Sequence, residues 1–280
     1  MTGNPKQIYK DYQNLHTHTT YCDGAQTARE MIEAAIVKGC GSIGFSEHSN
    51  VRFVERKYSM SPDVVGEYMR EIKALKEEYK GRIEVFLGIE QDYDSDPVAD
   101  VFDYVIGTVH HVIKEDQYIT VDCGAGTQKR IVCEYYHGDY YAFANDYYEK
   151  IAVMAKKIDA DIVGHFDVMT KNNFRGSLFD ETDPRYVASA INAMEEILKD
   201  CRLFEVNTGA MYRVGKPDPY PSPLLLKELR MRGGEVILTS DSHSADSLCF
   251  KFDEMCELLR SCGFRYVKRL TENGFVDDTL

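Results

Sequence analysis

The amino-acid sequence predicts an α/β barrel with parallel strands, built as a single domain over residues 1–280. Strand-like and helix-like segments alternate along the chain, which is the pattern of a parallel α/β fold. Seven such units occur without the glycine-rich fingerprint of dinucleotide-binding sheets, and this favours a barrel over an open sheet. Since no linker or low-complexity run interrupts the pattern, one domain is the simplest organisation.

Seven segments rich in β-branched and other apolar residues predict the strands. In chain order they span residues 12–20, 42–48, 83–90, 104–110, 160–165, 202–207 and 235–241. Helices are predicted from Thr27 to about Lys38, from Ser61 to near Gly81, from about Asp139 to Ile158, from Pro184 to about Lys199, from Leu224 to Met231 and from near Asp246 to Ser261. The first of these begins with a capping-box pattern, Thr27 with Glu30. Residues 111–138 predict an elaborated loop with a short hairpin arm.

The composition is that of a soluble globular protein, since 44% of the 280 residues are hydrophobic and 28% are charged. A formal net charge of −13 argues against nucleic-acid binding, because phosphate contacts need clustered Lys and Arg. No apolar run approaches the roughly 18 residues of a membrane span, and residues 1–7 lack the pattern of a secretion signal. We therefore expect a cytoplasmic protein that binds neither membranes nor nucleic acid. Its eight scattered cysteines predict reduced thiols.

Histidines and acidic residues gather at the ends of the predicted strands. They are His16, His18, His48, Glu90, His110, His165, Asp241 and His243. His16 and His18 are two residues apart in an extended segment, so their side chains share one face and can bind one ion. An isolated histidine is more often structural than a ligand, but chance does not readily place so many where barrel active sites form. The sequence therefore predicts a metal centre there.

Other polar residues near these strand ends are assigned different roles. Because adjacent strand residues face opposite sides, Glu47 and His111 are not expected to share the cavity with the histidines next to them. His137 is interpreted as an ordinary loop histidine. Asp167 and Asn207 are candidates for orienting the ligating imidazoles or the substrate, and helix capping is the alternative for Asp167.

Six short motifs follow the predicted strands: His-x-His, Glu-His, Gly-x-Glu, Gly-x-x-His, Gly-His-x-Asp and Ser-Asp-x-His. Together they resemble the motifs of the PHP (polymerase and histidinol phosphatase) superfamily, across essentially the whole chain. Residues 179–185, 205–209 and 219–222 resemble its histidinol-phosphatase branch. The resemblance implies a distorted seven-stranded (β/α)7 barrel, similar to a TIM barrel, with two to three divalent metal ions. Imidazole and carboxylate ligands suit Zn, Mn, Fe or Co.

The resemblance also implies a ligand set for each ion. The first ion would be bound by His16, His18, Glu90 and Asp241, the second by Glu90 as a bridge with His110 and His165, and the third by His48, His243 and Asp23. Asp23 departs from the pattern, since many relatives have a histidine one residue later, where this chain has Gly24. A carboxylate oxygen is an ordinary metal ligand. A turn residue before Gly24 is an equal alternative for Asp23.

The activity that the resemblance implies is hydrolysis of L-histidinol phosphate to L-histidinol and phosphate, a reaction of histidine biosynthesis. A hydroxide bridging the ions would attack phosphorus, with Glu90 as the bridging ligand. Asp241 or His243 would manage the proton.

Positively charged residues on the strand-end loops are candidates for binding this small phosphorylated substrate. Arg213 leads, because a planar guanidinium suits phosphate, and Lys216 and Arg175 follow. The imidazole and ammonium of histidinol phosphate would favour acidic loop residues such as Asp92 or Asp94.

Two other functions remain open. A related phosphoesterase would act on another small phosphate ester, a nucleotide or phosphotyrosine. In a different class, the chain would be an inactive metal-binding interaction module, which the nearly complete ligand set and the lack of an attached polymerase region disfavour. From the residues alone, the substrate is a small phosphate monoester.

Overall fold

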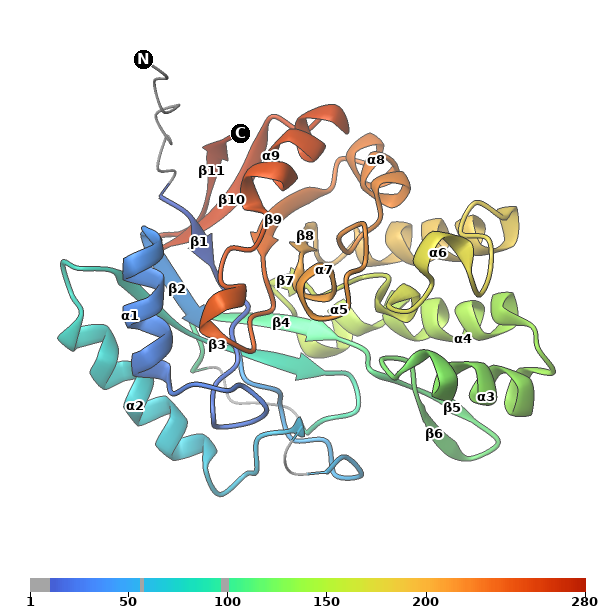
Figure 1. The fold of residues 1–280 in the computed structure, drawn as a ribbon, viewed down its shortest axis with the longest axis horizontal. Helices are drawn as coiled ribbons and strands as arrows, with labels where there is room; N and C mark the ends of the chain where they lie inside the picture. Colours follow the sequence, from blue (N-terminus) through green and yellow to red (C-terminus); the bar gives the residue numbers. More distant parts are fainter. Residues whose placement is uncertain (1–10, 56–57, 97–100) are drawn as a thin grey trace, which may run out of the picture.

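The barrel is seen in a computed structural model that describes residues 11–55, 58–96 and 101–280 (Figure 1). Across these residues, seven strands pair in parallel in the order β1-β2-β3-β4-β7-β8-β9. They are β1 (Gln13–Asn14), β2 (Ser42–Phe45), β3 (Glu84–Asp92), β4 (Tyr104–Thr108), β7 (Ile162–Val163), β8 (Leu203–Asn207) and β9 (Glu235–Thr239). Backbone hydrogen bonds of 2.9 Å, from His18 N to the Ser242 carbonyl and from Ser242 N to the His16 carbonyl, join the two edges of the sheet. The predicted seven-stranded α/β barrel is confirmed.

The barrel interior has an apolar half and a polar half. Residues two apart in a strand share a face, so both halves are formed by the same inward faces of the strands. An apolar cluster fills one half with Leu15, Phe86, Tyr104, Ile106, Ile162, Leu203, Ile237 and Leu270. Farther along the same strand faces stand buried carboxylates, Glu90 four residues after Phe86 and Glu205 two residues after Leu203. The strand register therefore delivers acidic groups to the carboxyl end of the barrel.

Tyr104 crosses the apolar half and requires two glycines beside it. Its hydroxyl donates to the carbonyl oxygens of Leu15 and Phe45. A Cβ atom on Gly44 would lie 2.4 Å from the Tyr104 hydroxyl oxygen, and one on Gly88 would lie 2.2 Å from Cζ. Since both separations are far inside van der Waals contact, neither position accepts a larger residue without displacing Tyr104.

Helices surround the barrel as predicted, with three differences in their bounds, one of which is that the last helix, expected from near Asp246, begins at Phe252. Helix α1 (Ala28–Lys38) begins at the predicted Thr27 capping box. Helix α2 (Val65–Glu78) begins later than predicted, because the Ser61 hydroxyl bonds to the side chain of Asp63 and a turn precedes the helix. The single helix expected to end at Ile158 is divided into α4 (Tyr140–Ala152) and α5 (Met154–Ile158).

The remaining helices of the outer layer follow the later strands. They are α6 (Pro184–Ile197), α7 (Gly209–Arg213), α8 (Pro223–Met231) and α9 (Phe252–Ser261). In Figure 1, α4 and α6 run side by side, and they make extensive contacts. Among the described residues, no helix has the length and hydropathy of a membrane span.

Two hairpins and one helix are added to the barrel. Residues 111–138, predicted as a loop with a hairpin arm, form the antiparallel pair β5 (His111–Lys114) and β6 (Gln117–Thr120), and then helix α3 (Ala125–Tyr136), which was not predicted. A second hairpin, β10 (Tyr266–Thr271) with β11 (Gly274–Thr279), was also not predicted. Its Leu270 joins the apolar interior cluster, and the Gln13 side chain bonds to the Leu270 backbone at 2.7 and 2.9 Å. This hairpin therefore covers the apolar half of the barrel.

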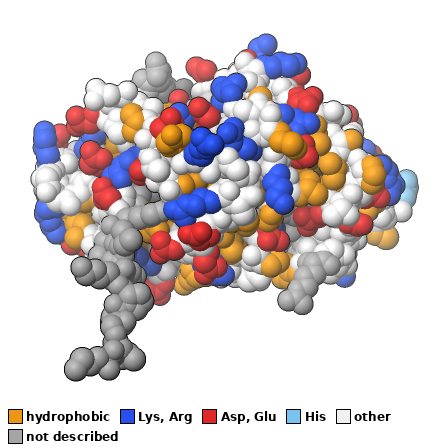
Figure 2. All heavy atoms as spheres, turned by 90° about the horizontal axis from the view of Figure 1, so that it is seen from above, with side chains coloured by type: hydrophobic (Ala, Val, Ile, Leu, Met, Phe, Trp, Pro, Cys, Tyr) orange, Lys and Arg blue, Asp and Glu red, His pale blue; other side chains and the backbone are white. Residues whose placement is uncertain are grey.

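Charged side chains of both signs are interspersed on the face of the molecule that Figure 2 shows. Exposed ion pairs include Arg29 with Glu78 at 2.5 Å and Arg52 with Asp96 at 2.9 Å. Exposed pairs of this kind contribute little to stability, because water and salt screen their charges. The fold therefore depends mainly on the apolar core.

Candidate metal centre

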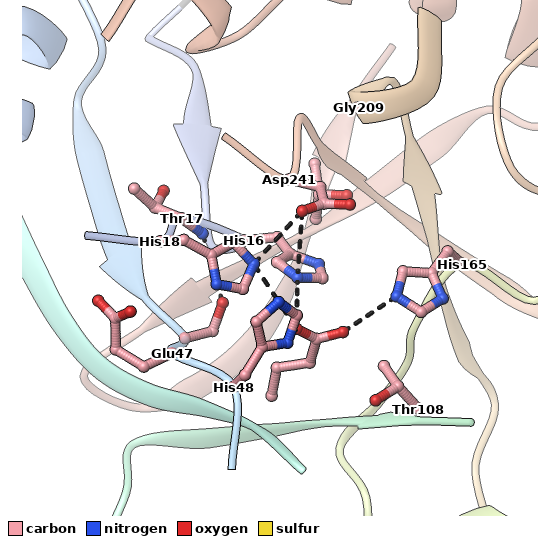
Figure 3. A network of polar contacts seen from close by, with 12 residues as sticks. His16, Thr17, His18, Glu47, His48, Thr108, His165, Gly209 and Asp241 are labelled. Carbon is pink, nitrogen blue, oxygen red and sulfur yellow. Dashed lines mark hydrogen bonds and ion pairs between the residues drawn. The ribbon is translucent and has the colours of Figure 1, made fainter. Parts of the chain in front are cut away.

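The predicted ligand residues meet at the carboxyl end of the barrel. Figure 3 shows His16, His18, His48 and Asp241 turned toward one another, with His165 approaching from the other side. Each ligand lies in, or just after, a barrel strand or in the turn that follows β1. The set that the structure brings together is His16, His18, Asp23, His48, Glu90, His110, His165, Asp241 and His243.

Glu90 lies at the centre of this set and is 1% exposed. Of the residues that the structure describes, five histidines direct a ring nitrogen at its carboxylate. Oε2 is 2.5 Å from His48 Nδ1, 3.4 Å from His16 Nε2 and 3.6 Å from His18 Nε2. Oε1 is 3.0 Å from His165 Nε2 and 3.4 Å from His110 Nε2. Because its two oxygens face different imidazoles, Glu90 has the geometry of a bridging ligand.

Two aspartates extend the set on either side of the histidines. Asp241 Oδ1 is 3.3 Å from His18 Nε2 and 3.7 Å from His16 Nε2. Asp23 Oδ1 is 3.3 Å from His243 Nε2 and 3.6 Å from His48 Nε2. Asp241 adopts a left-handed backbone with a φ of 45°, a conformation that Asp tolerates better than most L residues.

The donor atoms fit divalent cations. Within the described part of the chain, His16 Nε2 and His18 Nε2 are buried and have no hydrogen-bond partner. A buried polar atom left in this state costs about 1–3 kcal/mol. Ligand atoms of His16, His18 and Asp241 lie within 4.8 Å of one another, as do those of His48, Glu90 and His110, and those of His18, Asp23, His48 and His243. Mixed imidazole and carboxylate donors suit zinc and other transition metals.

The electrostatics of the site also favour a cation. Burial alone raises the pKa of Glu90, but the imidazoles of His48 and His16 outweigh burial and hold this pKa well below its usual value. Burial and the neighbouring His243 and His48 lower the pKa of His18 to about 3. Glu90 is therefore a carboxylate and His18 a neutral imidazole, which are the forms that bind metals. Burial lowers the pKa of His16 and of His48, but neighbouring carboxylates outweigh burial, raising the pKa of His16 and raising that of His48 to about 9, so a bound cation would displace a proton from each of these two rings.

Glu205, which the sequence analysis used only as part of the motif 205–209 and gave no role, contacts the histidines on the side away from the cavity. Its Oε2 accepts hydrogen bonds from His16 Nδ1 and Thr239 Oγ1, both at 2.8 Å. Its Oε1 accepts from the backbone N–H of His165 at 2.5 Å and from Asn207 Nδ2 at 2.8 Å. Carboxylates in this position fix the tautomer and ring orientation of metal-bound histidines. The sequence contained a signal for this role. Glu205 is a charged residue inside an otherwise apolar strand, two positions before Asn207.

The acidic residues expected near the substrate have other partners. Asp92 Oδ2 is 2.8 Å from His110 Nδ1, so it orients that imidazole. Asp94 pairs with Lys150 Nζ at 2.5 Å. Asp167 accepts from Ser222 N at 3.0 Å and makes no side-chain cap, so it secures the loop before α8. Asn207 Nδ2 is 3.3 Å from Asp241 Oδ2, a position from which it can orient that ligand.

A cavity of about 510 Å³ opens over the ligand set. Glu47 lies outside it, where it accepts from Thr19 Oγ1 at 2.6 Å and Cys22 Sγ at 2.7 Å. His111 lines the cavity, contrary to the expectation that it faces away. Strand β4 ends at Thr108 and His111 begins β5, so strand alternation does not carry across this step. His137 is an exposed residue at the end of α3.

The Arg and Lys side chains at the cavity differ in part from those that the sequence predicted. Arg213 lines it, and its Nη2 donates to Asp241 Oδ2 at 2.9 Å. Lys216 lies outside, because its Nζ donates to the carbonyl oxygens of Asp218 at 3.1 Å and Pro219 at 3.3 Å. The side chain of Arg175 is outside the described residues. Lys171, which was not predicted, lines the cavity and is 2.5 Å from Asp122 Oδ1.

Comparison with known proteins gives a consistent family. A model of the PHP domain matches residues 14–209. A "probable histidinol-phosphatase" of Deinococcus radiodurans is 29% identical over 262 residues, covering 90% of this chain and 94% of the relative. The histidinol-phosphatase of Bacillus subtilis is 24% identical, covering 86% and 97%. The crystal structure of histidinol phosphate phosphatase from Lactococcus lactis with Zn, L-histidinol and phosphate has a TM-score of 0.64 at 19% identity, covering 95% and 99%.

Proposed function

The chain belongs to the PHP domain family, and from this membership and the site geometry we propose that it is a metal-dependent phosphomonoesterase acting on L-histidinol phosphate. The observation that carries the proposal is the buried carboxylate of Glu90 between histidines from different strands. Relatives called histidinol-phosphatases that align over almost their whole length support the choice of substrate.

The ligand assignment is the one that the family resemblance implies, and the contacts among these side chains are compatible with it. One ion would be held by His16, His18, Glu90 and Asp241, a second by Glu90, His110 and His165, and a third by His48, His243 and Asp23. Bound divalent ions would supply the acidification of a water molecule and the neutralisation of phosphate charge. The part of this chain is to fix its own donor atoms in place, with Glu205 and Asp92 holding the rings of His16 and His110.

Asp241 and His243 are the two residues expected to handle a proton. Burial raises the pKa of Asp241, but Arg213 and His16 outweigh burial and hold this pKa well below its usual value. Asp241 is therefore ionised but a weak base, so a proton received from the attacking water would be passed on and not retained. His243, which is partly exposed at the cavity, would protonate the leaving oxygen only while it does not hold the third ion.

The lining of the cavity offers both charged and apolar contacts to a substrate. Arg213 and Lys171 bring positive charge to the cavity and would hold the phosphate oxygens. The lining also includes Val51, Val54 and His111, which would contact the organic portion of the ester.

The assay is phosphate release from L-histidinol phosphate, an aryl phosphate and a nucleotide monophosphate by the metal-loaded protein. We expect kcat/KM for histidinol phosphate to exceed the others by at least about 100-fold, since a site built to bind a substrate's polar groups rejects analogues lacking them. Comparable values for all three would identify a related phosphoesterase instead. Full metal occupancy without turnover of any of the three would favour an interaction module.

A further inference from the structure

Two cysteine thiols lie in contact outside the metal centre. Cys40 follows the end of α1, and Cys249 follows the 3-10 turn η4 (Ala245–Ser247). Their Sγ atoms are 3.1 Å apart although the residues are separated by 209 positions. Both thiols are free. The sulfur atoms therefore need to approach by only about 1 Å to reach the 2.03–2.05 Å of a disulfide bond.

The backbone around the two thiols is held by hydrogen bonds. Lys38 Nζ donates to the carbonyl oxygens of Asp246 at 2.7 Å and Leu248 at 3.1 Å, which ties the end of α1 to the segment before Cys249. The N–H of Cys40 donates to the Ala35 carbonyl at 3.0 Å, and that of Cys249 donates to Ser240 Oγ at 3.0 Å. These hydrogen bonds hold the two segments together, so the two sulfur atoms are kept facing each other.

The pair lies at the edge of the core. Cys40 is 7% exposed, and Cys249 is partly exposed. A small oxidant that reaches one thiol therefore leaves the other in contact with it, close enough to act as the resolving thiol.

We propose that Cys40 and Cys249 form a dithiol site that a low-molecular-weight disulfide, such as oxidised glutathione, converts to an intramolecular disulfide. One of the two thiolates attacks one sulfur of the small disulfide, forming a mixed disulfide and releasing one small thiol. The other thiolate then attacks the protein sulfur of the mixed disulfide and releases the second small thiol. The protein loses two protons and two electrons, and the small disulfide gains them.

The bond would join α1 to the loop that follows the metal centre. Cys249 N–H is bonded to Ser240 Oγ, and Ser240 immediately precedes Asp241. Closing a long loop reduces the entropy of the unfolded chain. We expect the thermal midpoint of the oxidised protein to rise by about 5–10 °C.

The test uses the full chain, purified with its thiols reduced and then incubated with oxidised glutathione. Non-reducing peptide mapping is expected to find a peptide that links Cys40 to Cys249, with the intact mass lower by two hydrogens at that pair. Cys40→Ser and Cys249→Ser should each yield no linked peptide. Cys133→Ser is the matched control, since Cys133 is exposed on α3, and it should leave the link unchanged.

Failure to recover the linked peptide from the wild-type protein would overturn the proposal. In that sample, glutathione bound to Cys133 would show that the reagent was active. Links that join other cysteines with equal yield would also overturn it. An unchanged thermal midpoint in the linked protein would refute the expected restraint.

Discussion

Replacing Glu205 with glutamine tests whether the carboxylate behind the metal centre fixes the orientation of His16. The substitution preserves size but removes the charge and replaces one acceptor oxygen with an NH2 donor. In the native chain, one carboxylate oxygen accepts from His16 and Thr239, and the other accepts from the His165 backbone and Asn207. Whichever way the amide is placed, its NH2 group faces donors.

The expected magnitude follows from these contacts. Hydrogen bonds to charged groups contribute about 1.5–3 kcal/mol, and a buried group left unpaired costs about 1–3 kcal/mol. We therefore expect the free energy of unfolding of Glu205→Gln to fall by about 2–4 kcal/mol. Loss of a carboxylate that orients a ligating histidine lowers metal affinity or activity by about 10–100-fold, which corresponds to about 1.4–2.7 kcal/mol.

Two measurements test this variant. Metal affinity is obtained by titration with elemental analysis of the bound ion, and kcat/KM is obtained by phosphate release. Glu235→Gln is the matched control, because Glu235 starts β9 at the other end of the barrel and pairs with Lys268 at 3.2 Å. If Glu205→Gln binds metal and turns over substrate within twofold of the control, the orienting role of Glu205 is refuted.

Three further predictions concern other groups. Glu90→Ala should abolish phosphate release while circular dichroism shows the fold retained, because one carboxylate faces both groups of imidazoles; near-normal turnover would contradict a bridging role. Arg213→Lys should lower kcat/KM by about 10–100-fold, since lysine lacks the planar fork, and unchanged steady-state kinetics would remove Arg213 from substrate binding. Burial, with a contribution from Asp167, raises the pKa of Glu181 to about 7 from 4.5, so stability from this group is lost as the pH rises from about 4.5 to 7. Glu181→Gln should therefore gain about 3 kcal/mol of relative stability between pH 4 and pH 8 in urea denaturation, and an equal effect at both pH values would contradict that shift.

The barrel and the convergence of the histidines and carboxylates at its rim could be predicted because both depend on local pattern. Apolar strand segments ended in histidines or acidic residues, and in a parallel barrel those ends meet at one rim. The first helix was recognisable from its capping box at Thr27. These signals lie within a few residues of one another, so long-range packing did not obscure them.

The errors came from contacts between distant segments or from breaks in strand geometry. Lys216 was expected at the substrate, but its ammonium donates hydrogen bonds to two carbonyl oxygens of its own loop. His111 was expected to face away, but the chain leaves β4 before it reaches this residue. Glu205 was given no role, because its role depends on His16, which is 189 positions distant. Such roles follow from tertiary register, which a single sequence pattern does not specify.

The claim that these separated side chains form a metal centre is tested most directly by anomalous diffraction. Crystals of the metal-loaded protein would be measured at the absorption edges of zinc and manganese. We predict peaks about 2.0–2.2 Å from His16 Nε2, from Asp241 and from an oxygen of Glu90. A protein that hydrolyses histidinol phosphate without an anomalous peak in contact with these atoms would contradict the account.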